Sequence, residues 1–176
     1  MVITLIGYRG SGKSAVAELL ATALGLQSVD SDHVVERQAG RSIREIFDQD
    51  GEAEFRRLEQ EVIRDLTGRT SLVIAAGGGA ILAEENCRCI KAAGPVVWLQ
   101  ASVENLARRI AQDKATSDRR PSLTGQSVQE EIASVLAARR PFYQDAATLI
   151  VHTDGLTSEQ VADRIRSLLD PPGVSS

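Results

Sequence analysis

Gly7-Tyr8-Arg9-Gly10-Ser11-Gly12-Lys13-Ser14 is the stretch that decides the fold, since it matches the phosphate-binding pattern G-x-x-x-x-G-K-[ST]. The apolar run at 2–6 before it predicts a buried strand, and the sequence at 13–24 after it predicts a helix. Glycines let backbone N–H groups turn inward around phosphate oxygens, and the helix presents its positive end to the same anion. Lys13 is expected to reach the β- and γ-phosphates, and the Ser14 hydroxyl to bind Mg²⁺. The loop predicts a nucleoside triphosphate site but leaves the phosphate acceptor open.

Short apolar runs and amphipathic stretches alternate along the rest of the chain. The runs lie at 27–29, 73–76, 96–99 and 147–152. None of them alternates apolar and polar side chains, which is expected of strands covered on both faces. Helical spacing occurs in two sets of apolar residues, the second after a capping-box pattern at Thr157 and Gln160: Phe55, Leu58, Val62 and Leu66, and Val161, Ile165 and Leu168. Alternating strands and helices predict an α/β fold with a parallel sheet and right-handed crossovers.

Two stretches interrupt this alternation. Residues 31–66 are charged and helical in pattern, and predict an inserted helical subdomain. Residues 113–125 are polar, and because long loops in compact domains often cover sites, a mobile lid is predicted there. Residues 170–176, with two prolines and two serines, predict a disordered tail. The remainder is expected to form a single domain over residues 1–169.

Composition limits the class of protein. With 43% hydrophobic residues among 176, the chain can bury a core of its own, which excludes a disordered protein. The net charge of −4 argues against a nucleic-acid partner, because such proteins are usually basic. Cys87 and Cys89 are separated by one residue, which fits neither a disulfide framework nor a zinc site, so ordinary packing is expected. The run at 2–6 is too short for a signal sequence or a membrane span, so a cytoplasmic protein without membrane contact is expected.

An acidic turn, a glycine run and several arginines are candidates for the acceptor site. Asp30-Ser31-Asp32 follows the run at 27–29, and the carboxyl ends of parallel strands line the ligand crevice. One carboxylate would suit a Mg²⁺ shell and the other would accept the proton of an attacking hydroxyl, although the same turn could be a simple helix cap. Gly77-Gly78-Gly79 would let a ligand approach bare backbone. Arginine suits carboxylate and phosphate groups, and three arginine positions stand out, each of which could alternatively be a surface charge: Arg56, Arg119-Arg120 and Arg139-Arg140.

Taken in order, these stretches resemble the shikimate kinase family over nearly the whole chain. Six of them carry the match: 7–14, Asp30-Ser31-Asp32, 51–57, 77–80, Arg120-Pro121 and 139–143. The resemblance implies the P-loop kinase fold, with a five-stranded parallel sheet flanked by helices, a helical substrate-binding insertion and a lid. It implies ATP-dependent phosphorylation of the 3-hydroxyl of shikimate, in the pathway to chorismate and the aromatic amino acids. The implied enzyme is a monomer that uses ATP and Mg²⁺.

The resemblance also implies roles for individual residues. The catalytic residues that it implies are Asp32, Lys13 and Arg120, with Asp32 as the base and Arg120 on the lid. The implied contacts to shikimate are Asp32, Arg56, Gly78 and Arg139, of which the two arginines would grip the carboxylate. The implied contacts to ATP are Gly10, Ser11, Gly12, Lys13, Ser14, Ala15, Arg109 and Arg120, and Arg109 would stack on the adenine. The implied metal ligands are Ser14 and, through water, Asp30.

Two positions depart from the family pattern. The lid reads Arg120-Pro121-Ser122-Leu123, where the family usually has leucine in place of Ser122, and the lid is longer than usual. No proline follows Thr153-Asp154, so the contacts of this chain to adenine are expected to differ there.

Other proteins share the phosphate loop. Another small kinase, such as a gluconate kinase, would not need paired arginines for a ring carboxylate, and no base-recognition pattern of a nucleoside monophosphate kinase occurs. A GTPase is disfavoured, because Asp48-Gln49-Asp50-Gly51 fits D-x-x-G but follows a helical pattern, and Asn-Lys-x-Asp is absent from the sequence. An inactive homologue serving as a binding module would be expected to lose Lys13, Asp32 or Arg120, and all three are present.

Overall fold

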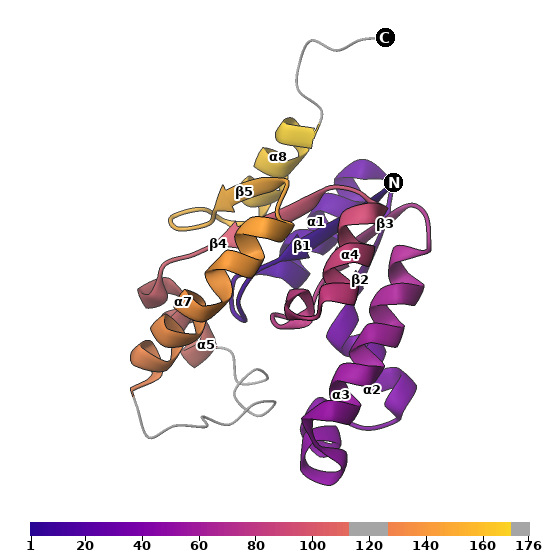
Figure 1. The fold of residues 1–176 in the computed structure, drawn as a ribbon. Coiled ribbons are helices and arrows are strands. Elements are labelled where there is room, and N and C mark those ends of the chain that lie inside the picture. The colour runs from indigo at the N-terminus through magenta and orange to yellow at the C-terminus, as the bar shows by residue number, and fades with distance from the viewer. Residues whose placement is uncertain (113–126, 170–176) are drawn as a thin grey trace.

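The structure, a computed structural model that describes residues 1–112 and 127–169, contains a five-stranded parallel sheet with helices on both faces (Figure 1). Its strands, in their order across the sheet, are β2 (Gln27–Asp30), β3 (Leu72–Ala75), β1 (Val2–Ile6), β4 (Val96–Gln100) and β5 (Leu149–His152). The predicted α/β fold is therefore confirmed. The predicted lid at 113–125 and the predicted tail at 170–176 lie outside the described residues.

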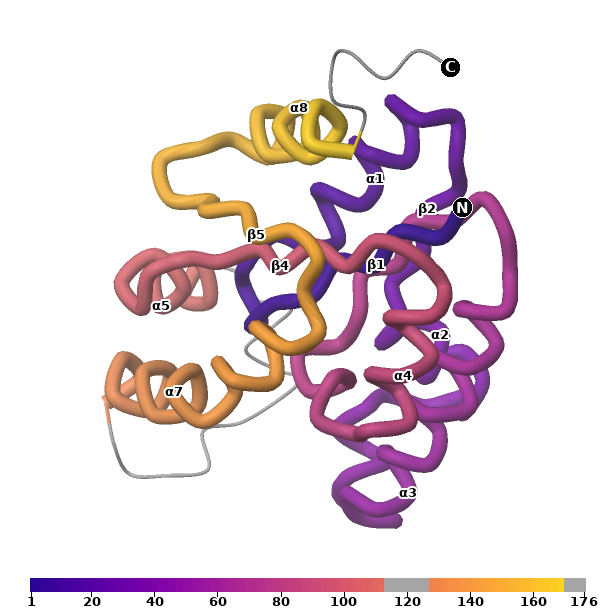
Figure 2. Tube along the Cα trace, turned by 45° about the horizontal axis from the view of Figure 1, so that its top comes forward, coloured from indigo at the N-terminus to yellow at the C-terminus, as the bar shows by residue number. Residues whose placement is uncertain are grey.

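Helices form a layer on each face of the sheet. In chain order they are α1 (Lys13–Leu24), α2 (Ser31–Ala39), α3 (Ile43–Thr67), the short 3-10 helix η1 (Ala80–Leu82), α4 (Glu84–Ala93), α5 (Val103–Gln112), α7 (Val128–Ala146) and α8 (Ser158–Leu169). Figure 2 shows α1 and α8 on one side of the sheet and α3, α4 and α7 on the other. Within the described ranges, no helix combines the length and apolar character needed to cross a membrane.

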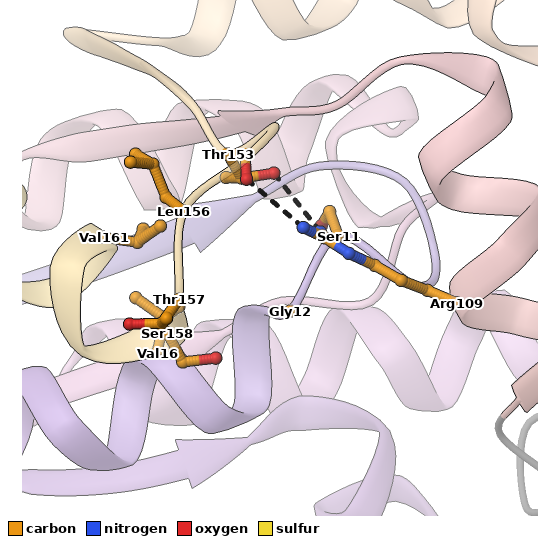
Figure 3. A pocket seen from close by; sticks show the side chains of 9 residues that line it. All are labelled: Ser11, Gly12, Val16, Arg109, Thr153, Leu156, Thr157, Ser158 and Val161. Carbon is orange, nitrogen blue, oxygen red and sulfur yellow. Dashed lines mark hydrogen bonds between the residues drawn. The ribbon is translucent and has the colours of Figure 1, made fainter.

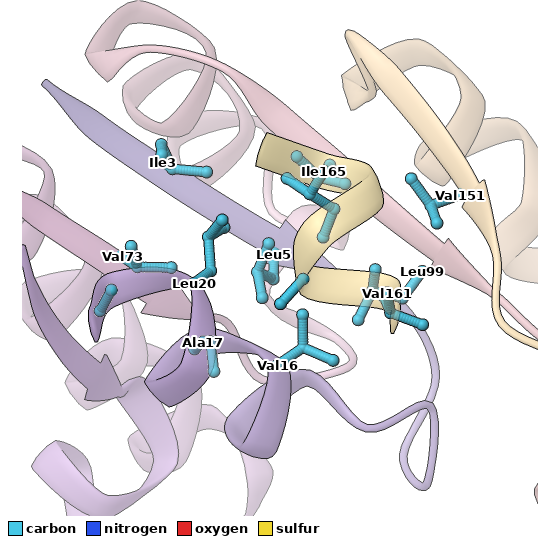
Figure 4. Close-up of a cluster of buried hydrophobic side chains, with 14 residues drawn as sticks. Ile3, Leu5, Val16, Ala17, Leu20, Val73, Leu99, Val151, Val161 and Ile165 are labelled. Carbon is cyan, nitrogen blue, oxygen red and sulfur yellow. The ribbon is translucent and has the colours of Figure 1, made fainter. Parts of the chain in front are cut away.

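Buried apolar side chains join each helical layer to the sheet. Under α1 and α8, Leu5 and Val73 of the sheet pack against Leu20 and Ile165 (Figure 4). On the opposite face, Ile74 packs with Phe55 of α3, and Trp98 packs with Tyr143 of α7. Burial of this kind is the main favourable term in folding. Cys87 and Cys89 are free thiols on α4 that pack against the same face, as expected.

Two expectations about burial are wrong. The outer strands are not covered on both faces: Gln27 and Ser28 of β2 are exposed, and Ile150 of β5 is 48% exposed. Both strands lie at the edges of the sheet, where the helical layers end. Leu168 on α8 is 45% exposed, and its neighbour Leu169 contacts the core instead.

Strand register brings the carboxyl ends of three strands to one level. Asp30 of β2 is paired with Ala75 of β3, and Ala75 is paired with Leu5 of β1. Each strand is followed, two residues further along the chain, by a predicted site residue: Asp32 after Asp30, Gly77 after Ala75 and Gly7 after Leu5. The sheet thus delivers three predicted parts of the site to the same edge, as expected for parallel strands.

Residues 31–66, predicted as a helical insertion, form α2 and most of α3. Ser42 and Glu45 make a capping box at the start of α3. Gly51 interrupts this helix with φ 82° and ψ 177°, a backbone conformation that favours glycine. Arg41, just before α3, donates hydrogen bonds to Gln49 and Asp50 beside this interruption. The kinked first part of α3 is therefore tied back to the end of α2.

Candidate active site

The phosphate loop joins β1 to α1 and requires its glycines. Gly7, Gly10 and Gly12 have φ angles of 145°, 77° and 90°, which L side chains rarely adopt. A Cβ atom on Gly7 would lie 2.6 Å from the carbonyl oxygen of Leu99, and one on Gly10 would lie 2.9 Å from Cγ1 of Ile110. The loop can pass this close to β4 and α5 only because Gly7 and Gly10 carry no side chain.

Lys13 and Ser14 begin α1 at the mouth of this loop. The Lys13 ammonium donates hydrogen bonds to the carbonyl oxygens of Gly7 and Tyr8, both at 2.9 Å. The Ser14 hydroxyl donates to Oδ2 of Asp30 at 2.5 Å. Ala15, the next predicted nucleotide contact, is exposed on the first turn of α1. The structure therefore places these predicted residues around one loop, next to the end of β2.

Asp30 uses its second carboxylate oxygen as a helix cap. Oδ1 accepts hydrogen bonds from the backbone amides of Asp32 at 2.9 Å and His33 at 3.4 Å, which begins α2. The helix-cap alternative drawn from the sequence is thus correct for one oxygen. The other oxygen lies beside Ser14, where a metal ligand is predicted. The cap therefore leaves Oδ2 beside Ser14, and the metal-ligand role of that oxygen stays a prediction.

The three residues Gly77–Gly79, here named the glycine segment, lie between the predicted acceptor-binding side chains. A Cβ atom on Gly77 would lie 2.5 Å from Oδ1 of Asp32, and one on Gly78 would lie 3.7 Å from a guanidinium nitrogen of Arg139. On Gly79 it would lie 3.0 Å from both terminal nitrogens of Arg56. Each glycine therefore borders one predicted residue, and the segment gathers side chains from α2, α3 and α7.

Two acidic residues hold Arg56 in place. Its guanidinium donates to Oε2 of Glu59 at 2.7 Å and to Oε1 of Glu52 at 3.2 and 3.3 Å. Burial alone would lower the pKa of Arg56, but Glu59 and Glu52 outweigh it and raise the pKa, so the cation is retained. Sequence reasoning missed the role of both acids. The available signal was their spacing, four residues before and three residues after Arg56 on one helix, which puts them on its face.

Arg139 reaches the middle of the glycine segment. Its guanidinium donates to the carbonyl oxygen of Gly78 at 3.1 Å and lies 6.0 Å from the ring centroid of Tyr8, within the phosphate loop. The hydroxyl of Tyr143 donates to the same carbonyl at 2.7 Å. Tyr143 was not predicted as a site residue, although it follows Arg139 by one helical turn. This corner connects the predicted acceptor site directly to the phosphate loop.

A separate pocket opens on the other side of the phosphate loop (Figure 3). Ser11 and Gly12 of the loop form part of its lining. The other lining residues are Val16, Arg109, Thr153, Leu156, Thr157, Ser158 and Val161. Arg109 extends from α5 and donates to the side-chain oxygen of Thr153 at 3.3 Å and to its carbonyl oxygen at 3.2 Å. The pocket is next to the phosphate site and has apolar side chains, Val16, Leu156 and Val161, beside hydroxyl groups, a mixture that suits the base of a nucleotide.

Asp154 fixes the loop that forms this pocket, where the family proline is missing. The backbone amide of Ser102 lies 3.1 Å from both carboxylate oxygens of Asp154. Burial alone would raise the pKa of Asp154, but the hydrogen bonds from Ser102 and Asn105 lower it below its ordinary value. Hydrogen bonds therefore constrain the loop without a proline. Arg120, the remaining predicted residue, lies outside the described residues.

Known proteins that resemble this chain do so over nearly its whole length. The family model described as shikimate kinase matches residues 9–170. A shikimate kinase of Rhodopirellula baltica is 45% identical over 161 residues, which span 92% of this chain and 86% of that protein. A shikimate kinase of Methylococcus capsulatus is 40% identical over 171 residues, which span 97% of this chain and 93% of that protein.

Solved structures agree with these sequences. The structure of a shikimate kinase from Acinetobacter baumannii in complex with shikimate has a TM-score of 0.91 and 34% identity, covering 99% of this chain and 95% of that one. The shikimate kinase of Aquifex aeolicus has a TM-score of 0.77 and 33% identity, covering 97% of this chain and 96% of that one. A family match over most of the chain, relatives above 30% identity and the same fold lead to one conclusion: this chain belongs to the shikimate kinase family.

Proposed function

We propose that this chain transfers the γ-phosphate of ATP to the 3-hydroxyl of shikimate. It is an ATP-dependent kinase by family, and the family acts in the pathway to chorismate and the aromatic amino acids. The observation that carries the assignment of the acceptor is the glycine segment, which borders Asp32, Arg139 and Arg56 one by one. A carboxylate, two guanidinium groups and bare backbone are the groups that a small hydroxylated carboxylic acid needs.

The two arginines are the residues proposed to bind the shikimate carboxylate. They come from different helices, and each already has an acceptor in the protein: Glu52 and Glu59 for Arg56, and the Gly78 carbonyl for Arg139. Arg56 is held between two acids, and a side chain that is held in place loses less entropy when a ligand binds. A planar guanidinium also matches the two oxygens of a carboxylate.

Asp32 is the proposed base for the reactive hydroxyl. It lies one residue after Ser31, whose side chain bonds to the glycine segment, and its carboxylate borders Gly77. Phosphoryl transfer depends mostly on positioning and on stabilising charge, so a fixed carboxylate that orients the hydroxyl is the main requirement. Lys13 would stabilise the phosphate charge at the loop. Arg120 is proposed to contact the transferring phosphate as well.

Ser14 and Asp30 would hold Mg²⁺ together with phosphate oxygens and water. Both offer oxygen atoms, the ligands that this ion prefers, and these oxygens are 2.5 Å apart at the phosphate loop. Among residues 1–112 and 127–169, no three His, Cys, Asp or Glu side chains are grouped to hold a metal on their own. A site completed by the nucleotide fits this arrangement. Bound there, Mg²⁺ would neutralise charge on the β- and γ-phosphates.

The pocket beside Ser11 and Gly12 is the proposed adenine site. Arg109 borders it and is the proposed stacking partner of the base, with Val16, Leu156 and Val161 as apolar wall. We further infer a cytoplasmic location, because an enzyme that consumes ATP needs the nucleotide pool of the cell interior. The proposed enzyme is a monomer that contacts neither membrane nor nucleic acid, and its net charge of −4 argues against the latter. Residues 31–66 are the proposed substrate-binding insertion, and residues 113–125 the proposed lid.

Release of ADP across a panel of acceptors tests this function. The panel contains shikimate, quinate, gluconate and nucleoside monophosphates, each with Mg²⁺ and ATP. Shikimate is expected to give the fastest turnover, with much slower ADP release when no acceptor is present, and NMR of the product should locate the phosphate on the 3-hydroxyl. Faster turnover of gluconate or of a nucleoside monophosphate would overturn the assignment.

A further inference from the structure

Two buried hydroxyl groups, one from α2 and one from α7, hold the backbone of the glycine segment. The backbone amide of Gly77 donates to the hydroxyl of Ser31 at 2.9 Å, from the start of α2. The carbonyl oxygen of Gly78 accepts the hydroxyl of Tyr143 at 2.7 Å, from α7. Ser31 is the neighbour of Asp32, and Tyr143 lies one helical turn after Arg139. Each hydroxyl thus fixes the backbone next to one proposed substrate residue.

Tyr143 is itself firmly placed. Its side chain is fully buried, and its ring stacks on Trp98 of β4 with centroids 5.4 Å apart and planes at 22°. A tyrosine ring of this kind packs as a large apolar group, while the hydroxyl needs a partner. Burial raises the pKa of Tyr143 above its ordinary value, so the hydroxyl keeps its proton and stays a donor. The ring therefore belongs to the buried core, and the hydroxyl makes a separate contact, the hydrogen bond to Gly78.

Tyr143 and Arg139 share one acceptor. The carbonyl oxygen of Gly78 has two lone pairs and accepts one hydrogen bond from each side chain, at 2.7 and 3.1 Å. When Arg139 turns to a ligand carboxylate, the carbonyl keeps the Tyr143 bond. Without the Tyr143 hydroxyl, the same movement of Arg139 would take away the remaining one of these two donors. Leaving a partly buried carbonyl unsatisfied costs free energy, so ligand binding would be weaker.

We propose that Tyr143 is a positioning residue for the acceptor: its hydroxyl fixes the Gly78 carbonyl and so frees the Arg139 guanidinium to bind the carboxylate of the substrate. This proposal rests on the proposed function. It adds a residue that touches neither substrate nor nucleotide, and it gives the tyrosine a role that ring packing alone does not require.

Tyr143→Phe tests the proposal, because it removes the hydroxyl and keeps the ring against Trp98. Steady-state ADP release is measured with varied shikimate and with varied ATP, beside thermal unfolding. The KM for shikimate is expected to rise about three- to tenfold, the usual worth of one hydrogen bond. The KM for ATP and the unfolding temperature should stay close to those of the unchanged protein, since packing and the nucleotide pocket are untouched.

Trp98→Phe is the matched control, because it weakens the ring packing and keeps the hydroxyl. It should lower the unfolding temperature and leave the KM for shikimate unchanged. Two results would overturn the proposal: an unchanged KM for shikimate in Tyr143→Phe, or equal rises in both KM values together with a lower unfolding temperature. The unchanged protein tests the proposed function separately. If it does not phosphorylate shikimate, the proposed function is refuted, whereas the results above for Tyr143→Phe refute only the role of Tyr143.

Discussion

The hydroxyl of Ser14 donates to Oδ2 of Asp30 over 2.5 Å, joining the first turn of α1 to the end of β2. These two oxygens are the proposed protein ligands of Mg²⁺, directly or through water. Asp30→Asn removes the charge, while asparagine remains a good helix cap for α2. The Mg²⁺ concentration needed for half-maximal rate should therefore rise, and excess Mg²⁺ should restore much of the activity at an unchanged unfolding temperature. An unaltered Mg²⁺ titration would contradict this role.

Asp32→Asn should behave differently, although it lies on the same turn. Asparagine has nearly the size of aspartate but cannot take a proton from the hydroxyl. We expect kcat to fall by roughly 10²–10⁴, the usual worth of a positioned general base, while shikimate still binds. Rapid-quench kinetics and a shikimate binding titration measure the two effects. Rescue by Mg²⁺ to the extent seen with Asp30→Asn would show that Asp32 is not the base.

Arg56→Lys should weaken shikimate binding, because lysine keeps the charge but loses the planar fork that meets a carboxylate. A charge-assisted bond lost from a desolvated site predicts a rise in the KM for shikimate of roughly ten- to a hundredfold, at unchanged KM for ATP. Arg57→Lys is the matched control: it changes the next residue of α3, which is exposed and pairs with Glu54 and Glu61. If both variants had the same KM for shikimate, Arg56 would not bind the carboxylate.

Gly79→Ala should disturb the acceptor site without unfolding the protein. Its new methyl group would lie 3.0 Å from the terminal nitrogens of Arg56, so the guanidinium that Glu52 and Glu59 hold would have to shift while the backbone stays in place. Shikimate affinity should fall while the unfolding temperature changes little. Gly94→Ala provides the contrast, since its methyl group would lie 2.2 Å from the backbone oxygen of Val2 at φ 153°. That variant should lose stability, and its unfolding temperature should fall by roughly 2–4 °C for each kcal/mol of unfolding free energy lost, as in other chains of this size.

Asp154→Asn should affect the nucleotide instead. The carboxylate accepts the Ser102 amide with both oxygens and so holds the loop that carries Thr153. Replacing it should raise the KM for ATP and leave the KM for shikimate unchanged, as steady-state kinetics would reveal. Since the folded-state pKa is lowered, the stabilisation is complete above the ordinary value of 3.8 and is lost as pH falls through the lower one. Between pH 5 and 8, which lies above the ordinary pKa, the Asp154 carboxylate should stay ionised. Its titration should therefore not change the KM for ATP in this range.

Local sequence signals predicted the phosphate loop well. The strand at 2–6, the loop glycines and the helix at 13–24 appear as expected, because each depends on residues close together in the chain. The exposure of Ile150 could not be predicted in this way. Strand β5 looks as apolar as a central strand, and only the order of strands across the sheet makes it an edge.

Glu59 and Tyr143 show the same limit within the site. Glu59 is spaced one helical turn after Arg56, and Tyr143 one turn after Arg139, but spacing alone does not show that either side chain supports the site. Tyr143 meets Gly78 across 65 residues of sequence. Glu59 is buried because Arg56 and the glycine segment surround it, and their approach depends on how α3 packs on the sheet. Side chains that act by supporting others emerge only with the three-dimensional fold.

The glycine segment has an evolutionary consequence. It borders the proposed acceptor site with main chain, and a point mutation can crowd the Gly78 carbonyl but cannot change its chemical nature. Mutations in the glycine segment can therefore change the shape of this side of the site but not the chemical groups that its main chain offers. A lineage that acquired a different acceptor would have to alter the side chains around the segment, such as Asp32, Arg56 and Arg139, which offer far more chemical alternatives to selection.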